Sequence, residues 1–128
     1  MIFDYSEKVK VLDTDYTIVI KAFSDDEFFE KQSADGYCDY TNKTIGLCNL
    51  KTDDRWKNEA ELDIRAAMDA TLRHEIVHAF LYESGLYMSS ASVSAWAANE
   101  EMVDWFALQG LKIVKAWFDA GCVRTPIG

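Results

Sequence analysis

The hydrophobic periodicity of the sequence changes at about residue 59, and this change limits the possible folds more than any other feature. Before it, apolar residues alternate with polar ones or form short β-branched runs bounded by turn residues, which is typical of strands. After it, apolar residues recur at helical spacing between strong helix formers, which is typical of amphipathic helices. We therefore expect an α+β domain in which a small antiparallel sheet packs on two long helices.

The first half of the chain predicts two hairpins with a short helix between them. Strands at 8–12 and 16–21 flank turn residues and form the first hairpin. An acidic run with a helix N-cap signal predicts a helix over roughly 25–32. Strands at 36–40 and 44–48 form the second hairpin.

The second half predicts a helix from about residue 59, ended by Gly85, and a loop over 86–92. A second helix is expected to start near Ser92 or Ser94 and to run to about residue 119. Gly110 inside it costs up to ~1 kcal/mol relative to Ala or marks a close helix contact. The apolar stripe expected to face the core consists of Val103, Ala107, Leu111, Val114 and Phe118.

Length and charge narrow the class of protein. The chain has 128 residues, with 13 Lys and Arg against 22 Asp and Glu, and a net charge of −9. This length predicts one domain spanning 1–128. The acidic balance argues against nucleic acid or an anionic membrane as a partner, because both bind basic surfaces. The N-terminus lacks a signal-peptide pattern and no apolar stretch approaches the roughly 18 residues that span a bilayer, so we expect a cytoplasmic protein.

The three cysteines, Cys38, Cys48 and Cys122, form no closely spaced pair of the kind that binds zinc. We expect them to be reduced and to pack as small apolar side chains. A disulfide between Cys38 and Cys48 is the alternative.

The two histidines of the chain occur in the sequence His-Glu-Ile-Val-His at 74–78, within the first predicted long helix. Their spacing places both imidazoles on one face, one turn apart, so that both can reach one metal ion. Glu75 is offset from His74 by about 100°. Its carboxylate can there accept a proton from a metal-bound water without being a ligand. The small residues Ala67 and Thr71 lie on the same stripe and leave room for a metal and another helix.

A catalytic zinc ion has three protein ligands and one open position for water, so a third ligand must come from elsewhere. Glu100 and Asp104 are one turn apart near the start of the second helix and fall on its expected apolar stripe. Carboxylates on a core-facing stripe need a compensating partner. We expect Glu100 to bind the metal and Asp104 to accept the N–H of a ligand histidine. Glu101 is the rival ligand, and ordinary carboxylates near a helix N-terminus are the alternative for both positions.

The motif His-Glu-x-x-His, followed by Asn-Glu-x-x-x-Asp at 99–104, resembles the gluzincin zinc metallopeptidases. The layout from about Lys8 to Phe118 resembles the short bacterial and phage members of the ImmA/IrrE type, including the step Phe106-Ala107. Asp104 stands where that type usually has Asn, and the pair of DNA-binding helices often attached to such proteins is missing from the sequence.

The resemblance implies a zincin-like fold and a zinc metalloendopeptidase, acting on a protein or peptide substrate in a phage or mobile element. It assigns His74, His78 and Glu100 as Zn²⁺ ligands, Glu75 as general base and Asp104 as the partner of a ligand histidine. The oxyanion donor is expected among Tyr37, Tyr40, Tyr82 and Tyr87, with Tyr87 favoured.

We expect substrate backbone to add to a sheet edge. The resemblance implies that the edge is the strand just ahead of the metal helix, because zincin folds usually place the substrate cleft there. Its residues Thr44, Ile45, Gly46 and Leu47 are therefore the candidate substrate-binding residues, and an ordinary paired strand is the alternative.

Three other functions remain open. The first is a catalytically silent zinc-binding module for protein interaction, which Trp105 on the polar side of its helix would favour as an exposed indole. The second is a DNA-associated SprT-like protease, but such proteins use a third histidine and the chain has only two. The third is a zinc hydrolase of small amides.

Overall fold

The computed structural model describes residues 3–89 and 100–124, except for the side chains of 89, 100, 101, 103, 104 and 107. Its strands are β1 (Lys8–Val11), β2 (Thr14–Ala22), β3 (Gly36–Asp39) and β4 (Thr44–Asn49). Its α-helices are α1 (Glu27–Lys31), α2 (Glu61–Glu83), α3 (Leu86–Ser89) and α4 (Glu100–Ala120). Three 3₁₀ turns complete the list: η1 (Phe23–Asp25), η2 (Leu50–Thr52) and η3 (Asp54–Trp56).

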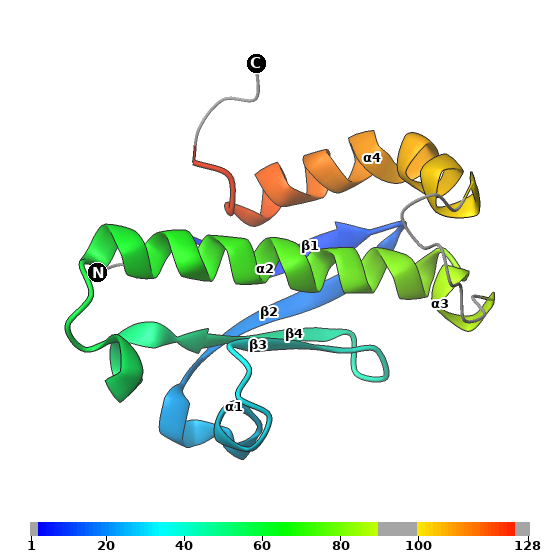
Figure 1. The fold of residues 1–128 in the computed structure, drawn as a ribbon. Coiled ribbons are helices and arrows are strands. Elements are labelled where there is room, and N and C mark those ends of the chain that lie inside the picture. The colour runs from blue at the N-terminus through cyan, green and yellow to red at the C-terminus, as the bar shows by residue number, and fades with distance from the viewer. Residues whose placement is uncertain (1–2, 90–99, 125–128) are drawn as a thin grey trace.

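The four strands form one sheet in the order β1-β2-β4-β3 (Figure 1). The two predicted hairpins are confirmed, because β1 pairs antiparallel with β2 and β3 pairs antiparallel with β4. The expectation of a purely antiparallel sheet is wrong, since β2 and β4 run parallel in the centre. The connection through α1 and β3 reverses the chain between them, and parallel neighbours require such a crossover. The α+β class itself is confirmed.

The expected helix over roughly 25–32 is divided between η1 and α1. Asp26 lies between them in extended conformation, and its carboxylate accepts a hydrogen bond of 3.0 Å from the backbone N–H of Phe28. This residue is therefore the N-cap that starts α1. The expected loop after Gly85 contains the short helix α3.

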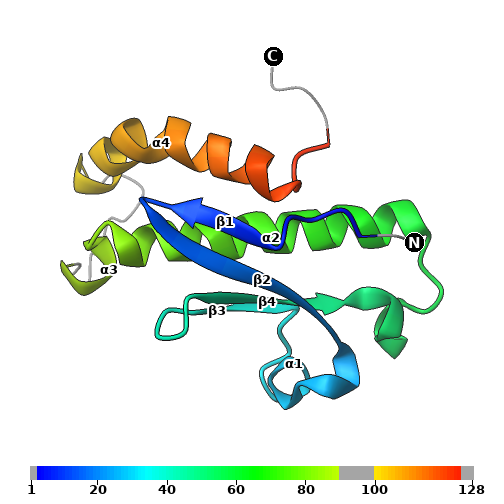
Figure 2. The same ribbon diagram turned by 180° about the vertical axis from the view of Figure 1, so that it is seen from behind.

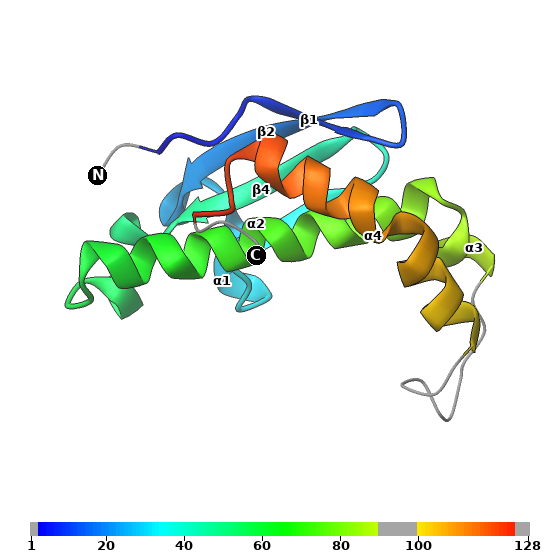
Figure 3. The ribbon, with the colours of Figure 1, turned by 90° about the horizontal axis from the view of Figure 1, so that it is seen from above.

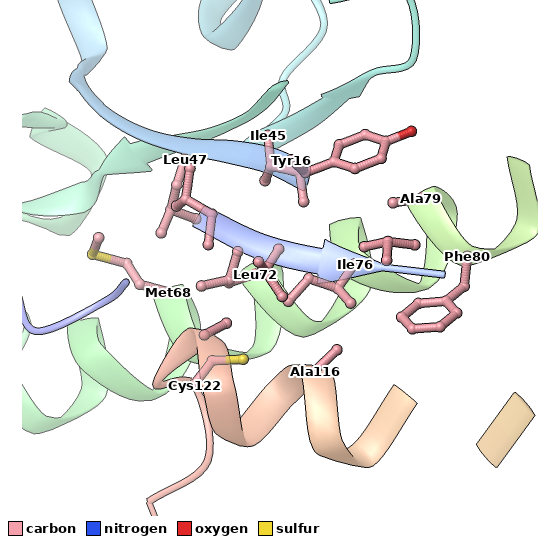
Figure 4. Packing of buried hydrophobic residues seen from close by; sticks show 14 of the residues in the cluster. Tyr16, Ile45, Leu47, Met68, Leu72, Ile76, Ala79, Phe80, Ala116 and Cys122 are labelled. Carbon is pink, nitrogen blue, oxygen red and sulfur yellow. The ribbon is translucent and has the colours of Figure 1, made fainter. Parts of the chain in front are cut away.

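Helix α2 lies across one face of the sheet, and α4 lies beside α2 and β1 (Figures 1 and 2). The core fills the space between these layers. It joins Tyr16, Ile45 and Leu47 of the strands to Met68, Leu72 and Ile76 of α2 (Figure 4). Cys48 and Cys122 are buried and Cys38 half-buried, and all three are free thiols, so the alternative disulfide does not form.

Helix α4 turns a different face to the core from the predicted stripe. Leu111 and Phe118 of that stripe are 85% and 48% exposed, and Val114 is half-buried. The side chains of the other two stripe residues, Val103 and Ala107, lie outside the described part of the chain. Trp105 is buried instead, together with Ile113, Ala116 and Ala120. The prediction failed because apolar residues occur on most sides of this helix, so periodicity alone did not single out the buried side.

Trp105 donates a hydrogen bond of 2.8 Å from its indole N–H to the hydroxyl of Ser84, which caps the end of α2. Only 8% of the residue is exposed. It is therefore part of the core, and the idea that it presents an exposed partner surface is wrong.

Among residues 3–89 and 100–124, none of the helices combines the length and apolar character that a bilayer crossing needs.

Candidate metal centre

Helix α2 brings the two histidines together on one face. Nε2 of His74 lies 3.0 Å from Nε2 of His78, and the two rings meet at 72° with centroids 4.7 Å apart. Two nitrogens bound to one tetrahedral zinc ion at ordinary bond lengths are roughly 3.3 Å apart. The pair therefore fits a shared metal after a small change in side-chain torsion.

Glu75 completes the group, since one ligand atom from each of His74, Glu75 and His78 lies within 4.8 Å of the others. Glu75 is only 7% exposed, whereas His74 is exposed and His78 is half-buried. Burial raises the pKa of Glu75 to about 7, because the ionised form loses its hydration. A general base works best with a pKa near the operating pH.

The surroundings also favour the neutral imidazole that binds metals. Burial and the charge of His74 lower the pKa of His78 below its ordinary value. A neutral ring offers a nitrogen lone pair to a cation without first releasing a proton.

An open hollow of about 350 Å³ lies directly beside this group. It is lined on one side by Thr71, His74 and Glu75 of α2, and on the other by Asp35 and Gly36 at the start of β3. The hollow gives a substrate access to the carboxylate and to the exposed imidazole.

Gly36 is a site residue that the sequence reasoning missed. A Cβ at this position would lie 2.8 Å from Cγ2 of Thr71 and 3.4 Å from Cγ of Glu75. Strand β3 therefore passes against α2 at the point where the base projects, and only glycine allows that approach. The sequence predicted that the small side chain of Thr71 leaves room for another helix. In the structure it leaves room for strand β3 instead. A glycine that opens a strand was the available signal.

The prediction that the strand at 44–48 forms the sheet edge is wrong. β4 lies between β2 and β3 and pairs with both, so its backbone groups are already used. Ile45, Gly46 and Leu47 are buried and Thr44 is half-buried. A Cβ on Gly46 would overlap the ring of Tyr37. The edge beside α2 is instead β3.

The four candidate tyrosines divide into two groups. Tyr37 lies on the other face of the sheet, where it packs on Phe28 and accepts a hydrogen bond of 2.9 Å from Lys21. Tyr40 stacks on Tyr82, with ring centroids 4.5 Å apart and planes at 4°.

Tyr87, in α3, lies 5.3 Å from Tyr40 and 5.9 Å from Tyr82, centroid to centroid, and is 53% exposed. Burial, followed by the charges of Cys38, Tyr87 and Glu75, raises the pKa of Tyr40 to about 12. Tyr40 therefore keeps its proton at neutral pH and lies within electrostatic reach of Glu75.

The predicted third ligand falls at the start of α4, which begins at Glu100. The side chains of Glu100, Glu101 and Asp104 lie outside the described part of the chain.

Comparisons with protein-family models, with curated proteins and with solved structures found no match for this chain. The functional interpretation therefore rests on the residues and their geometry.

Proposed function

We propose that this protein is a zinc-dependent metallopeptidase of zincin-like fold, resembling the ImmA/IrrE type, that hydrolyses peptide bonds in a protein substrate. One observation carries the proposal: two imidazole nitrogens 3.0 Å apart share a helix face with a buried carboxylate that opens onto a hollow. An ordinary pair of surface histidines would not need a buried acid beside it that forms no hydrogen bond or ion pair with another described residue, because burial of a carboxylate costs free energy.

In this proposal His74 and His78 hold the ion, with Glu100 or its neighbour Glu101 as third ligand. A zinc ion held there would lower the pKa of a water molecule toward ~7 and polarise the scissile carbonyl. Glu75 takes the proton of the attacking water on its carboxylate and passes it to the leaving amine. Its pKa of about 7 in the metal-free chain suits both steps.

The substrate is proposed to bind as an extended chain along β3 and across the hollow. Within the described residues β3 pairs only with β4, so its outer backbone groups are available to a peptide strand. Gly36 keeps this edge close to Glu75.

The developing oxyanion also needs a hydrogen-bond donor, and we assign it to the group formed by Tyr40, Tyr82 and Tyr87. Tyr40 is favoured within this group because Glu75 is one of the charges that raise its pKa, so its hydroxyl lies within electrostatic reach of the base. Tyr87 stays a candidate, since it packs against Tyr40.

The test is cleavage of a peptide library by the zinc-loaded protein and by Glu75→Gln. Glu75→Gln should keep its zinc and lose cleavage by roughly a hundredfold or more, the ordinary contribution of a general base. Glu61→Gln, at the exposed start of the same helix, is the matched control and should cleave like the parent. Zinc binding with equal cleavage by Glu75→Gln would rule out this mechanism, and zinc binding without cleavage by the parent would favour the silent binding module.

A further inference from the structure

A second cavity, of about 500 Å³, lies on the other side of α2 from the hollow. Its walls come from the first half of α2, from the end of α4 and from the segment that follows it, which Figure 3 shows lying over α2. The lining includes Leu62, Arg65, Asp69, Arg73, Trp117 and Arg124. Its volume falls within the range of small-molecule sites.

The charge of this cavity is opposite to that of the chain. The sequence has four arginines and a net charge of −9, yet Arg65, Arg73 and Arg124 all line this cavity. Asp69 is the one acidic residue among the described residues of its lining. Such a concentration of guanidinium groups favours an anionic ligand.

The acidic lining residue is already neutralised. Arg124 donates two hydrogen bonds to Asp69, of 2.7 Å from Nε and 3.0 Å from Nη2, and the hydroxyl of Tyr5 donates a third of 2.6 Å. Asp4 pairs with both Arg124 and Arg65, at 2.9 and 3.3 Å. These two carboxylates therefore account for two of the three arginine charges.

Arg73 is the remaining cation. Its Nη1 donates a hydrogen bond of 2.8 Å to the backbone carbonyl of Cys122, which is a neutral acceptor. No carboxylate of the described chain forms an ion pair with this guanidinium. Most of its five N–H donors stay available to an oxyanion, which guanidinium groups bind with two parallel hydrogen bonds.

Trp117, another lining residue, carries a second donor that has no partner among the described residues. Its indole Nε1 is buried, and no acceptor is found for it within the described residues. A buried N–H without a partner costs free energy unless something accepts its hydrogen bond. Its ring, with Leu62, also provides an apolar wall.

We propose that this cavity binds a small organic anion, in which a carboxylate or phosphate group is attached to a flat apolar body. Arg73 and the indole N–H of Trp117 bind the oxyanion, and the ring of Trp117 and Leu62 contact the body. The site is separate from the metal centre, because the two cavities share no lining residue in the part of the chain that the structure describes.

The probes are inorganic phosphate, benzoate and phenyl phosphate, titrated while the indole N–H resonances are followed by NMR. The titration is run on the parent and on the double variant His74→Ala/His78→Ala, so that binding to a metal cannot contribute. Trp117→Phe identifies the resonance of interest. Phenyl phosphate or benzoate should shift that resonance downfield with a Kd of about 1 mM or tighter, and inorganic phosphate should bind more weakly.

Arg73→Gln should weaken binding roughly tenfold or more, the usual loss for a charge-assisted hydrogen bond. Trp117→Phe keeps an aromatic wall and should also weaken binding, as measured by calorimetry. Lys57→Gln removes one positive charge at an exposed position elsewhere and should bind like the parent. Absence of a saturable shift with all three probes, or parental affinity in both Arg73→Gln and Trp117→Phe, would overturn the proposal. Equal affinity for inorganic phosphate and phenyl phosphate would contradict the proposal that the cavity also binds an apolar body.

Discussion

Gly36 of β3 approaches Thr71 of α2 so closely that a Cβ on the glycine would lie 2.8 Å from the threonine methyl group. This contact sets the distance between the sheet edge and the helix that carries the two histidines. The geometry of the hollow therefore depends on a residue with no chemistry of its own.

Substitution Gly36→Ala should destabilise the protein by about 1–3 kcal/mol, the usual cost of overpacking. The new methyl group must displace Thr71 or Glu75, or move away from the carbonyl of Gly46, which lies 3.0 Å away. Urea denaturation measures the change. Thr71→Ser removes the opposing methyl group and keeps the hydroxyl that bonds to the carbonyl of Ala67. The double variant should therefore recover part of the loss, and a Gly36→Ala protein as stable as the parent would contradict the close approach.

Glu75→Gln should stabilise the metal-free protein at neutral and higher pH. The pKa of Glu75 is raised from 4.5 to about 7 by burial, so the folded state binds more protons than the unfolded state between these values. Stability from this group is present below the unfolded pKa and is lost as pH rises through the folded pKa. The substitution removes that loss, with a gain of up to about 3 kcal/mol near about pH 8 and little gain near about pH 5.

Denaturation of chelator-treated protein at the two pH values measures this effect. Glu61→Gln is the control, since Glu61 is exposed and its hydrogen bond with Lys51 lowers its pKa. It should give no such gain at high pH. A Glu75→Gln protein less stable than the parent at both pH values would show that the carboxylate is a structural group.

Gly110→Ala should stabilise the protein by about 0.5–1 kcal/mol, because alanine has the higher helix propensity. A Cβ at Gly110 would meet nothing within 4 Å among the described residues. Of the two expectations for this glycine, a propensity cost or a close helix contact, the first is therefore the one that the structure supports. Thermal unfolding checks the gain, and a loss of stability would mean that a neighbour occupies this space.

Glu100→Ala and Glu101→Ala separate the two candidates for the third ligand. The resemblance predicts that Glu100 is the ligand, and the neighbouring Glu101 is its rival in the sequence. The variant that removes the ligand should bind zinc at least roughly tenfold more weakly in a competition titration with a chromogenic chelator. The other variant serves as its matched control, and parental affinity in both would show that the third ligand lies elsewhere.

The features predicted well from the sequence are local. Each hairpin and the pair His74 and His78 depend on residues close together in the chain, so periodicity and spacing are enough to place them. The parallel pairing of β2 with β4 is not local, and neither is the contact of Gly36 with Thr71. Both arise only when the chain folds back, and the edge role assigned to residues 44–47 failed for that reason.

The sequence also did not predict which face of α4 is buried in the core. Leu111 and Phe118 carry the expected spacing, yet the helix buries Trp105, whose indole N–H binds Ser84 at the end of α2. A specific hydrogen bond and the fit of one large ring decided the orientation, and neither is visible in a hydrophobic pattern.

We propose that His74 and His78 bind one metal ion between them. The most direct test is the zinc content of the protein after zinc loading and exhaustive dialysis, measured by inductively coupled plasma mass spectrometry. The parent and Lys57→Gln should each hold about one zinc ion per chain, and His74→Ala and His78→Ala should hold near-background zinc, with folding checked by circular dichroism. A parent without zinc, or a folded His74→Ala/His78→Ala double variant that retains it, would contradict the claim.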